Sequence, residues 1–195
     1  MQLLEAKVFG GAVTGEDTAK SLDQGLLNED WPSQLYRVLK AARVRQVSYV
    51  PDAGHSELIR LFAADPGVVS NVLTTEEEGI AIATGAWLGG SRSVLLLQSS
   101  GVGNCVNMLS LVTMTRTPLL MLVTMRGEWA EFNPWQVPMG LATAPVLTAM
   151  GIRVMRAETP HDLIETVESA ATLAFDAEQQ VAVLLSQRLL GAKKW

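Results

Sequence analysis

Three consecutive carboxylates stand at the start of an apolar segment, because residues 76–78 are all glutamate and small residues follow them as far as Trp87. Carboxyl groups are among the side chains that enzymes use to hold or transfer a proton. Thr74 or Thr75 can cap a helix here, and acidic side chains in a first turn suit the positive end of the helix dipole. The same residues also fit a solvated acidic turn without a chemical role, and this pattern leaves both interpretations open.

The helix predicted behind these glutamates carries almost no side-chain bulk, since Ala81, Ala83, Gly85 and Ala86 lie along it. Glycine inside a helix costs up to about 1 kcal/mol relative to alanine. Its presence therefore indicates that the helix approaches a sheet or a partner helix closely.

A second polar segment, residues 98–104, reads Gln-Ser-Ser-Gly-Val-Gly-Asn and predicts a loop between a strand and a helix. Its glycines, Gly101 and Gly103, allow a ligand to approach the backbone. Helix N-termini bind anions, so a phosphate loop is one interpretation. The segment lacks the third glycine of a dinucleotide fingerprint and the Gly-Lys-Ser/Thr of a Walker loop. This weakens the interpretation of the chain as a free-standing nucleotide-binding domain.

Few other side chains suggest chemistry. His55 follows the Pro51-Asp52 strand end and fits either a local loop contact or a substrate contact, whereas we expect His161 on the surface. The two histidines lack metal-ligand spacing, which argues against a zinc site. Cys105 has no nearby histidine, so we expect a buried structural thiol. The absence of a Gly-x-Ser-x-Gly motif argues against a serine hydrolase.

Composition narrows the function further. With 195 residues the chain suits one domain, and its 48% hydrophobic and 18% charged residues indicate a buried parallel sheet or a large subunit interface. The net charge of -5 argues against a nucleic-acid or anionic-membrane partner. A single cysteine fits a reducing compartment. Because no apolar run is long enough to span a bilayer and the N-terminus lacks a signal-peptide pattern, we expect a cytoplasmic protein.

Apolar periodicity predicts six strands that alternate with helices. The strands are expected at residues 47–50, 68–73, 93–98, 118–125, 152–155 and 181–186. This alternation implies a three-layer α/β/α fold with a six-stranded, mostly parallel sheet.

Residues 30–195 would form this domain. Residues 1–29 show little periodicity and would form an N-terminal extension or arm. Ligands of such sheets bind beyond the carboxyl ends of the strands, where the segments 51–56, 99–104 and 126–136 and the acidic turn converge.

Taken together, these segments resemble the pyrimidine-binding domain of thiamine-diphosphate enzymes, most closely the sulfopyruvate and phosphonopyruvate decarboxylases. The resemblance covers about residues 32–190. It rests first on Val-Pro-Asp at 50–52 and on Glu-Glu-Glu-Gly-Ile-Ala at 76–81, which is followed by Gly-Ala at 85–86. The other matching motifs are Gln-x-Ser-Gly-x-Gly-Asn at 98–104 with Asn107, Arg-Gly-Glu at 126–128, and Gln-Val-Pro-Met-Gly at 136–140.

The resemblance implies roles for particular residues. The family glutamate lies nine positions before the glycine of the alanine-rich helix, which selects Glu76 as the catalytic carboxyl group that hydrogen-bonds the cofactor's aminopyrimidine and favours its imino tautomer. The expected reaction is decarboxylation of a 2-oxo acid. The other expected cofactor contacts are Pro51, Ser100, Gly101, Gly103 and Asn104. The expected substrate contacts are His55, Gln98, Arg126 and Gln136.

The resemblance also implies a partner. The family holds Mg²⁺ and diphosphate through a Gly-Asp-Gly motif that this chain lacks, so we expect no metal ligand here and a beta subunit that carries the diphosphate-binding domain. The assembly would be a hetero-oligomer such as α2β2, with thiamine diphosphate shared at its interface.

Three departures from the family pattern leave the substrate open: Ser99, Met125 and the Ala-Gly-His at 53–55. Met125 and the tryptophan-bearing loop at 129–135 suggest a more apolar pocket. A carbon–carbon lyase or carboligase subunit, or a non-catalytic regulatory α/β module, remains an alternative function.

Overall fold

The structure, a computed structural model, describes residues 30–191. The extension predicted for residues 1–29 lies outside the described residues. The predicted fold class is confirmed: six strands form one sheet, and every pair of neighbouring strands is parallel. The spatial order is β2-β1-β3-β4-β6-β5, with β1 (Val44–Tyr49), β2 (Val69–Val72), β3 (Arg92–Gln98), β4 (Leu119–Thr124), β5 (Arg153–Ala157) and β6 (Gln180–Leu185).

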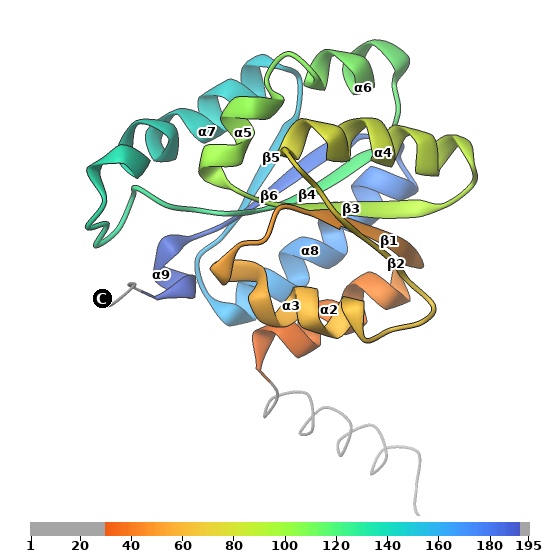
Figure 1. The fold of residues 1–195 in the computed structure, drawn as a ribbon, viewed down its shortest axis with the longest axis horizontal. Helices are drawn as coiled ribbons and strands as arrows, with labels where there is room; N and C mark the ends of the chain where they lie inside the picture. The colour runs from red at the N-terminus through yellow and green to blue at the C-terminus, as the bar shows by residue number, and fades with distance from the viewer. Residues whose placement is uncertain (1–29, 192–195) are drawn as a thin grey trace, which may run out of the picture. The chain divides into compact units, whose positions relative to one another are not determined.

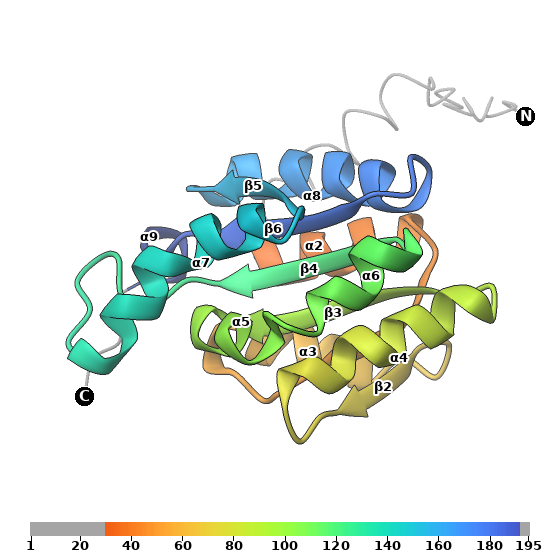
Figure 2. The ribbon, with the colours of Figure 1, turned by 90° about the horizontal axis from the view of Figure 1, so that it is seen from above.

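Helices cover both faces of this sheet (Figure 1). One face packs against α2 (Trp31–Ala41), α3 (Ser56–Ala63) and α8 (Pro160–Phe175). The other packs against α4 (Glu76–Leu88), α5 (Ser99–Cys105), α6 (Leu109–Thr115) and α7 (Val137–Ala149), which lie side by side over the strands in Figure 2. The remaining elements are short: η1 (Ala53–His55), η2 (Pro134–Gln136) and α9 (Gln187–Leu190).

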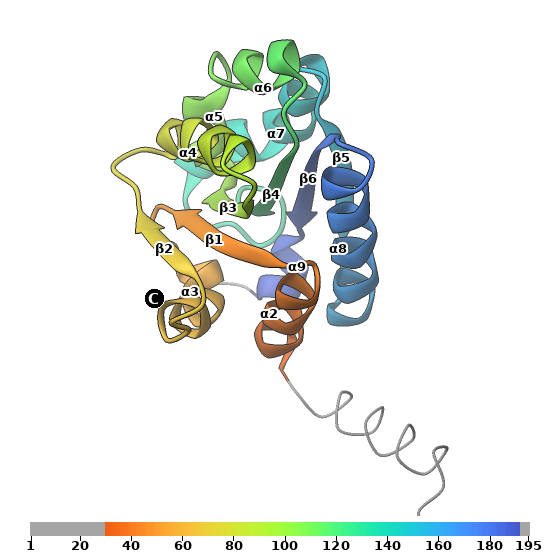
Figure 3. The same ribbon diagram turned by 90° about the vertical axis from the view of Figure 1, so that its right-hand side faces the viewer.

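Alternating side chains of the central strands build the two cores. On β3, Val94 and Leu96 face α2, α3 and α8, whereas Leu95 and Leu97 face the other layer. All four are buried, because a strand covered on both faces has no solvent side. Figure 3 shows the sheet between these two layers. Within residues 30–191, we find no helix with the length and apolar character needed to cross a membrane.

The strand order places a topological switch between β1 and β3. The chain leaves β1 toward β2 on one side, and β3 lies on the other side of β1. Parallel sheets bind ligands in the crevice outside the carboxyl ends of the strands at such a point. Segments that follow β1, β2, β3 and β4 therefore form the first place to look for a site.

One local prediction was wrong, and another was confirmed only in part. Residues 99–104 form no loop, because α5 begins at Ser99 directly after β3. The buried side chains of Val102 and Cys105 hold this helix against the sheet, which outweighs the low helix propensity of its glycines. Thr75 is the N-cap residue of α4, but its side chain makes no capping hydrogen bond. Instead, the Glu78 carboxylate accepts a hydrogen bond from the backbone N–H of Thr74 at 2.9 Å.

Candidate active site

Glu76 and α5 meet where β2 and β3 end. Glu76 is the first residue of α4, and the side chain of Asn104 on α5 donates a hydrogen bond to its Oε2 at 2.8 Å. The carboxylate also lies against Gly101, where an added Cβ would stand 2.4 Å from Oε1. Only a residue without a side chain leaves this space for the carboxylate. Glu77 and Glu78 are exposed and Glu76 is half-buried, so the structure distinguishes the three glutamates.

Cys105 lies close enough to these glutamates for their charges to affect the pKa of its thiol. Its thiol is buried, and burial, followed by the charges of Glu76 and Glu77, raises the pKa of Cys105 to about 12. The thiol therefore stays protonated, as a structural residue would.

Asp52 joins the ends of three strands in a second cluster. Its Oδ1 accepts a hydrogen bond from the Gln98 side chain at 3.0 Å, and its Oδ2 accepts hydrogen bonds from the Thr124 hydroxyl at 2.7 Å and the Gly54 backbone N–H at 3.1 Å. Ser100 in turn donates a hydrogen bond to Gln98 Oε1 at 2.9 Å. The carboxylate thus spans the switch point between β1 and β3 and fixes the Gln98 amide.

His55 lies inside the protein. The side chain is fully buried, and its Nε2 lies 3.1 Å from the carbonyl oxygen of Leu122, to which a neutral ring donates a hydrogen bond. Burial lowers the pKa of His55, although the nearby charge of Asp52 opposes this shift. Of the two interpretations of His55, this geometry favours the local contact.

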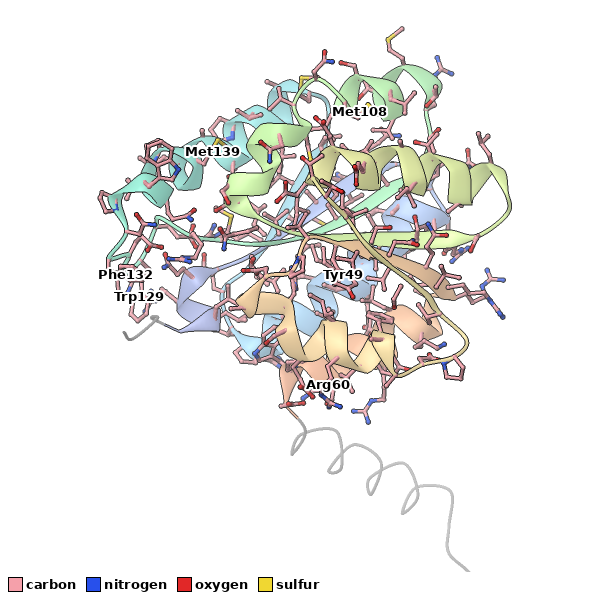
Figure 4. All side chains as sticks on the ribbon, in the orientation of Figure 1. Tyr49, Arg60, Met108, Trp129, Phe132 and Met139 are labelled. Atoms are coloured by element: carbon pink, nitrogen blue, oxygen red, sulfur yellow. The ribbon has the colours of Figure 1, made fainter. Side chains whose placement is uncertain are left out.

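Arg126 is committed to an ion pair. Its Nε and Nη2 each donate a hydrogen bond of 2.6 Å to the Glu131 carboxylate, and its guanidinium lies 5.7 Å from the centre of the Phe132 ring. The Arg126 guanidinium lowers the pKa of Glu131 to about 2. Glu131 in turn raises the pKa of Arg126. Figure 4 labels Phe132 and Trp129 in the loop that holds this pair.

The loop between β4 and α7 closes tightly on itself. A Cβ on Gly127 would stand 2.3 Å from the Gln136 carbonyl oxygen, and one on Gly140 would stand 2.2 Å from the Arg126 carbonyl oxygen. Gln187 on α9 secures the loop by accepting hydrogen bonds from the backbone N–H groups of Glu128 and Trp129 at 3.2 and 3.0 Å. The conformation of this loop is therefore fixed by contacts within the described chain.

The remaining predicted site residues are spread along the same edge. Pro51 and Gly103 are exposed, and Gly103 faces the Met139 side chain. Gln136 is half-buried, and its Oε1 has no hydrogen-bond donor among the described residues. This unpaired atom is an acceptor, which suits a donor group on a ligand better than an acidic one.

The pocket beside Asp52 is small. A pocket of about 190 Å³ is lined by Asp52, Ala53, Gly54, Thr124, Met125, Arg126, Gln187, Leu190 and Gly191. Met125 contributes one apolar wall of this pocket, whereas Trp135 is 86% exposed. A wider open groove of about 680 Å³ lies along the ends of β5 and β6, beside Glu128, Arg156, Glu158 and Arg188.

Four residues of these clusters were not among the predicted site residues: Asp52, Thr124, Glu131 and Gln187. Asp52 was noted only as part of a motif, although its position shortly after the end of β1 was a signal. Thr124 is the last residue of an otherwise apolar strand, which was a weaker signal. Nothing in the spacing pointed to Glu131 or Gln187. In the described part of the chain, no group of three or more His, Cys, Asp or Glu side chains could hold a metal ion.

Comparison with solved structures identifies the class of fold. The benzoylformate decarboxylase of Polynucleobacter necessarius superimposes with a TM-score of 0.66 at 17% identity, covering 82% of this chain and 30% of that chain. A thiamin diphosphate-dependent enzyme of Mycobacterium smegmatis, described as putative, gives 0.65 at 15% identity over 86% of this chain and 34% of that chain. The domain therefore has the fold of thiamine-diphosphate enzymes and spans about a third of these longer chains.

Sequence comparison identifies the family. The alpha subunit of sulfopyruvate decarboxylase from Methanococcus maripaludis is 34% identical over 152 residues, which is 77% of this chain and 91% of the relative. The alpha subunit from Methanothermobacter thermautotrophicus is 33% identical over 80% of this chain and 95% of the relative. The phosphonopyruvate decarboxylase of Streptomyces viridochromogenes is 37% identical over 53% of this chain and 27% of its own length. No family model matches the chain. The chain belongs to the sulfopyruvate decarboxylase alpha-subunit family, which confirms the resemblance drawn from its motifs.

Proposed function

We propose that this chain is the alpha subunit of a thiamine-diphosphate-dependent 2-oxo acid decarboxylase that acts on sulfopyruvate or a close analogue. Family membership over most of the chain supports the reaction class. The single observation that carries the assignment of the site is the position of Glu76 against Gly101. A carboxyl group held at the strand ends, with no side chain opposite it, fits the need to share a proton with a ring nitrogen of a flat heteroaromatic group.

Glu76 would hold the proton shared with N1′ of the aminopyrimidine. Asn104 fixes the carboxylate through its 2.8 Å hydrogen bond to Oε2, which leaves Oε1 over Gly101. When bound, thiamine diphosphate supplies the nucleophilic carbon and the electron sink for loss of carbon dioxide. The chain itself contributes the carboxylate, the close backbone approach at Gly101 and the amide of Gln98, which Asp52 orients.

The diphosphate and Mg²⁺ would be held by a second polypeptide. The chain has no Gly-Asp-Gly, and the described residues offer no group of metal ligands. We expect a beta subunit to supply this half of the site, in a hetero-oligomer such as α2β2. Gln98 and Gln136 remain proposed substrate contacts of this chain, both neutral.

The test is to co-express the chain with a neighbouring gene product that contains Gly-Asp-Gly. Isothermal titration with thiamine diphosphate and Mg²⁺ should show binding to the purified pair and none to either chain alone. The pair should release carbon dioxide from sulfopyruvate. Assays of phosphonopyruvate, pyruvate and aryl 2-oxo acids would define the substrate. A pair that binds the cofactor but joins or cleaves carbon–carbon bonds without decarboxylation would favour the lyase or carboligase alternative.

Glu76→Gln is the decisive variant, with Glu77→Gln as the matched control on the exposed neighbour. Loss of a positioned proton-transfer group costs about 10²- to 10⁴-fold in rate. We expect Glu76→Gln to lose activity on this scale with the fold intact by circular dichroism, and Glu77→Gln to stay close to wild type. Equal turnover of the Glu76→Gln variant and the wild-type protein would reject the assignment.

A further inference from the structure

The guanidinium of Arg126 is already matched by a carboxylate. The Arg126 and Glu131 side chains are 9% and 4% exposed, and two parallel N–H donors of the arginine meet both carboxylate oxygens at 2.6 Å. Bidentate pairs of this kind are among the strong hydrogen-bonded contacts in proteins. An arginine that binds an acidic substrate needs these same donors.

Glu131 is held in place by several partners besides Arg126, so separating this ion pair would be costly in free energy. Its carboxylate also accepts hydrogen bonds from the backbone N–H groups of Gly127 and Asn133 at 3.2 and 3.0 Å, and from the Gln187 side chain at 2.9 Å. It is thus the hub of the loop that follows β4. Removal of one partner from a buried ion pair leaves an uncompensated charge, which is strongly destabilising.

The surrounding charges also disfavour an anion at this place. Asp52 and Arg126 line the same pocket, and Glu131 adds a second carboxylate beside the arginine. The three groups together carry one net negative charge. The next arginine along the edge, Arg156, is paired with both Glu128 and Glu158.

We infer that Glu131 withdraws Arg126 from substrate recognition, so that Arg126 does not meet the substrate's second acidic group. The inference rests on the proposed function for the nature of the substrate. It assigns Glu131 as a specificity-determining residue, because its carboxylate keeps a cation of this chain masked at the pocket. Arg126 then serves to fix the loop and does not bind the sulfonate.

The masking can be tested on the full chain without any turnover. The Arg126 Nε–Hε signal, assigned in a ¹⁵N-arginine NMR spectrum by its loss in Arg126→Lys, should exchange slowly with water. Titration with methanesulfonate or sulfate should leave it in place in the wild-type protein. In Glu131→Gln the same titration should shift it. A saturable shift of the wild-type signal would overturn the inference.

Kinetics of the assembled pair give the second test. The ratio of kcat/KM for sulfopyruvate to that for pyruvate should stay within about twofold of wild type in the Arg126→Gln/Glu131→Gln double variant, which removes both charges together. If Arg126 bound the sulfonate, loss of this contact would lower the ratio by about 100-fold. The single variant Glu131→Gln should raise the ratio, because it exposes a cation.

The two hypotheses fail in different ways. A wild-type pair that decarboxylates no 2-oxo acid rejects the proposed function, whereas the NMR titration still decides whether Arg126 is masked. An active pair whose double variant loses its preference for sulfopyruvate rejects the inference only. If the double variant does not assemble, the Glu131→Gln variant decides through its kcat/KM ratio for sulfopyruvate over pyruvate and through the NMR titration. An unchanged ratio, together with an Arg126 signal that does not shift on titration, would contradict the inference.

Discussion

The carboxylate of Glu76 occupies the space that a side chain at position 101 would need. The ideal Cβ position of Gly101 lies 2.4 Å from Oε1, 2.5 Å from Cδ and 2.6 Å from Cγ of Glu76, all far inside van der Waals contact. The glycine and the glutamate come from two neighbouring helices, α5 and α4, that cover the same face of the sheet. The placement of the carboxylate is therefore a property of the pair and not of α4 alone.

Gly101→Ala should separate this placement from the fold. The new methyl group meets only the far end of a flexible side chain, so the glutamate can move away and α5 can persist. Alanine also favours a helix over glycine by about 1 kcal/mol. We expect the variant pair to unfold at an unchanged or higher temperature and to bind thiamine diphosphate at least about tenfold more weakly, a loss of about 1.4 kcal/mol, by isothermal titration.

Gly103→Ala is the matched control for this prediction. It lies on the same helix, and its nearest neighbour, Met139 Sδ, would stand 3.4 Å from the added Cβ, at ordinary contact distance. Although Gly103 is among the expected cofactor contacts, its added Cβ would face Met139 and not Glu76, so cofactor affinity should change far less than in Gly101→Ala. An equal loss in both variants would trace the effect to α5 as a whole and not to Glu76.

Asn104→Asp should disturb the same carboxylate by charge. The Asn104 amide donates to Glu76 Oε2 at 2.8 Å, and an aspartate at this position would place two carboxylates against each other. Loss of a hydrogen bond to a charged group costs about 1.5 to 3 kcal/mol, so kcat/KM of the pair should fall about 10- to 100-fold. Ser110→Asp adds the same charge at an exposed position and should have little effect. Equal activity of the two variants would contradict the proposed role of Asn104.

Local sequence patterns predicted the elements of the fold well, because apolar periodicity depends only on which side chains are buried. The start of α8 carries a Thr159–Asp162 capping box with Pro160 in the first turn, a signal of a helix start that the sequence alone displays. The apolar run at residues 94–97 of β3 likewise indicates a strand buried on both faces. Helix α5 was missed because the glycines that weaken its propensity are compensated by tertiary packing of Val102 and Cys105.

The site was predictable in position but less so in its interactions. The rule that ligands bind at carboxyl strand ends placed Glu76, Gln98 and Asn104 on one edge, and the structure brings Glu76 and Asn104 into contact. The pairing of Arg126 with Glu131 could not be predicted, since it depends on how a 12-residue connection between β4 and α7 folds back on itself. Side-chain charge in the sequence does not reveal whether that charge is already matched.

Asp52→Ala should destabilise the chain more than removal of a typical surface carboxylate. Asp52 accepts three hydrogen bonds from Gln98, Thr124 and Gly54, which join segments at the ends of β1, β3 and β4. We expect the free energy of unfolding in urea to fall by about 2 to 3 kcal/mol, as for buried donors that lose a charged acceptor. Asp176→Ala, which breaks only the half-exposed ion pair with Arg92, should cost under about 1 kcal/mol. Equal costs for the two variants would show that Asp52 is not a structural hub.

Acid should weaken the loop after β4 through Glu131. The Arg126 guanidinium, the backbone N–H groups of Asn133 and Gly127, and Gln187 lower the pKa of Glu131 from the usual 4.5 to about 2. A group whose pKa is lower in the folded state stabilises the fold above its unfolded-state pKa, and this contribution is lost as the pH falls toward the folded-state value. The free energy of unfolding should therefore decrease as the pH falls from about 4.5 to about 2, and part of this slope should be missing in Glu131→Gln.

Asp65 shares the same low pKa, of about 2, and lies in a separate cluster with Lys40, so Asp65→Asn provides the control that removes a different part of the acid dependence. Acrylamide quenching of Trp129, which is 43% exposed, followed over the same pH range in a Trp135→Phe background, should increase as the pH falls in the otherwise wild-type protein and in Asp65→Asn, and should already be high near neutral pH in Glu131→Gln. Tryptophan quenching in Glu131→Gln that matched wild type at every pH would show that the ion pair does not hold the loop.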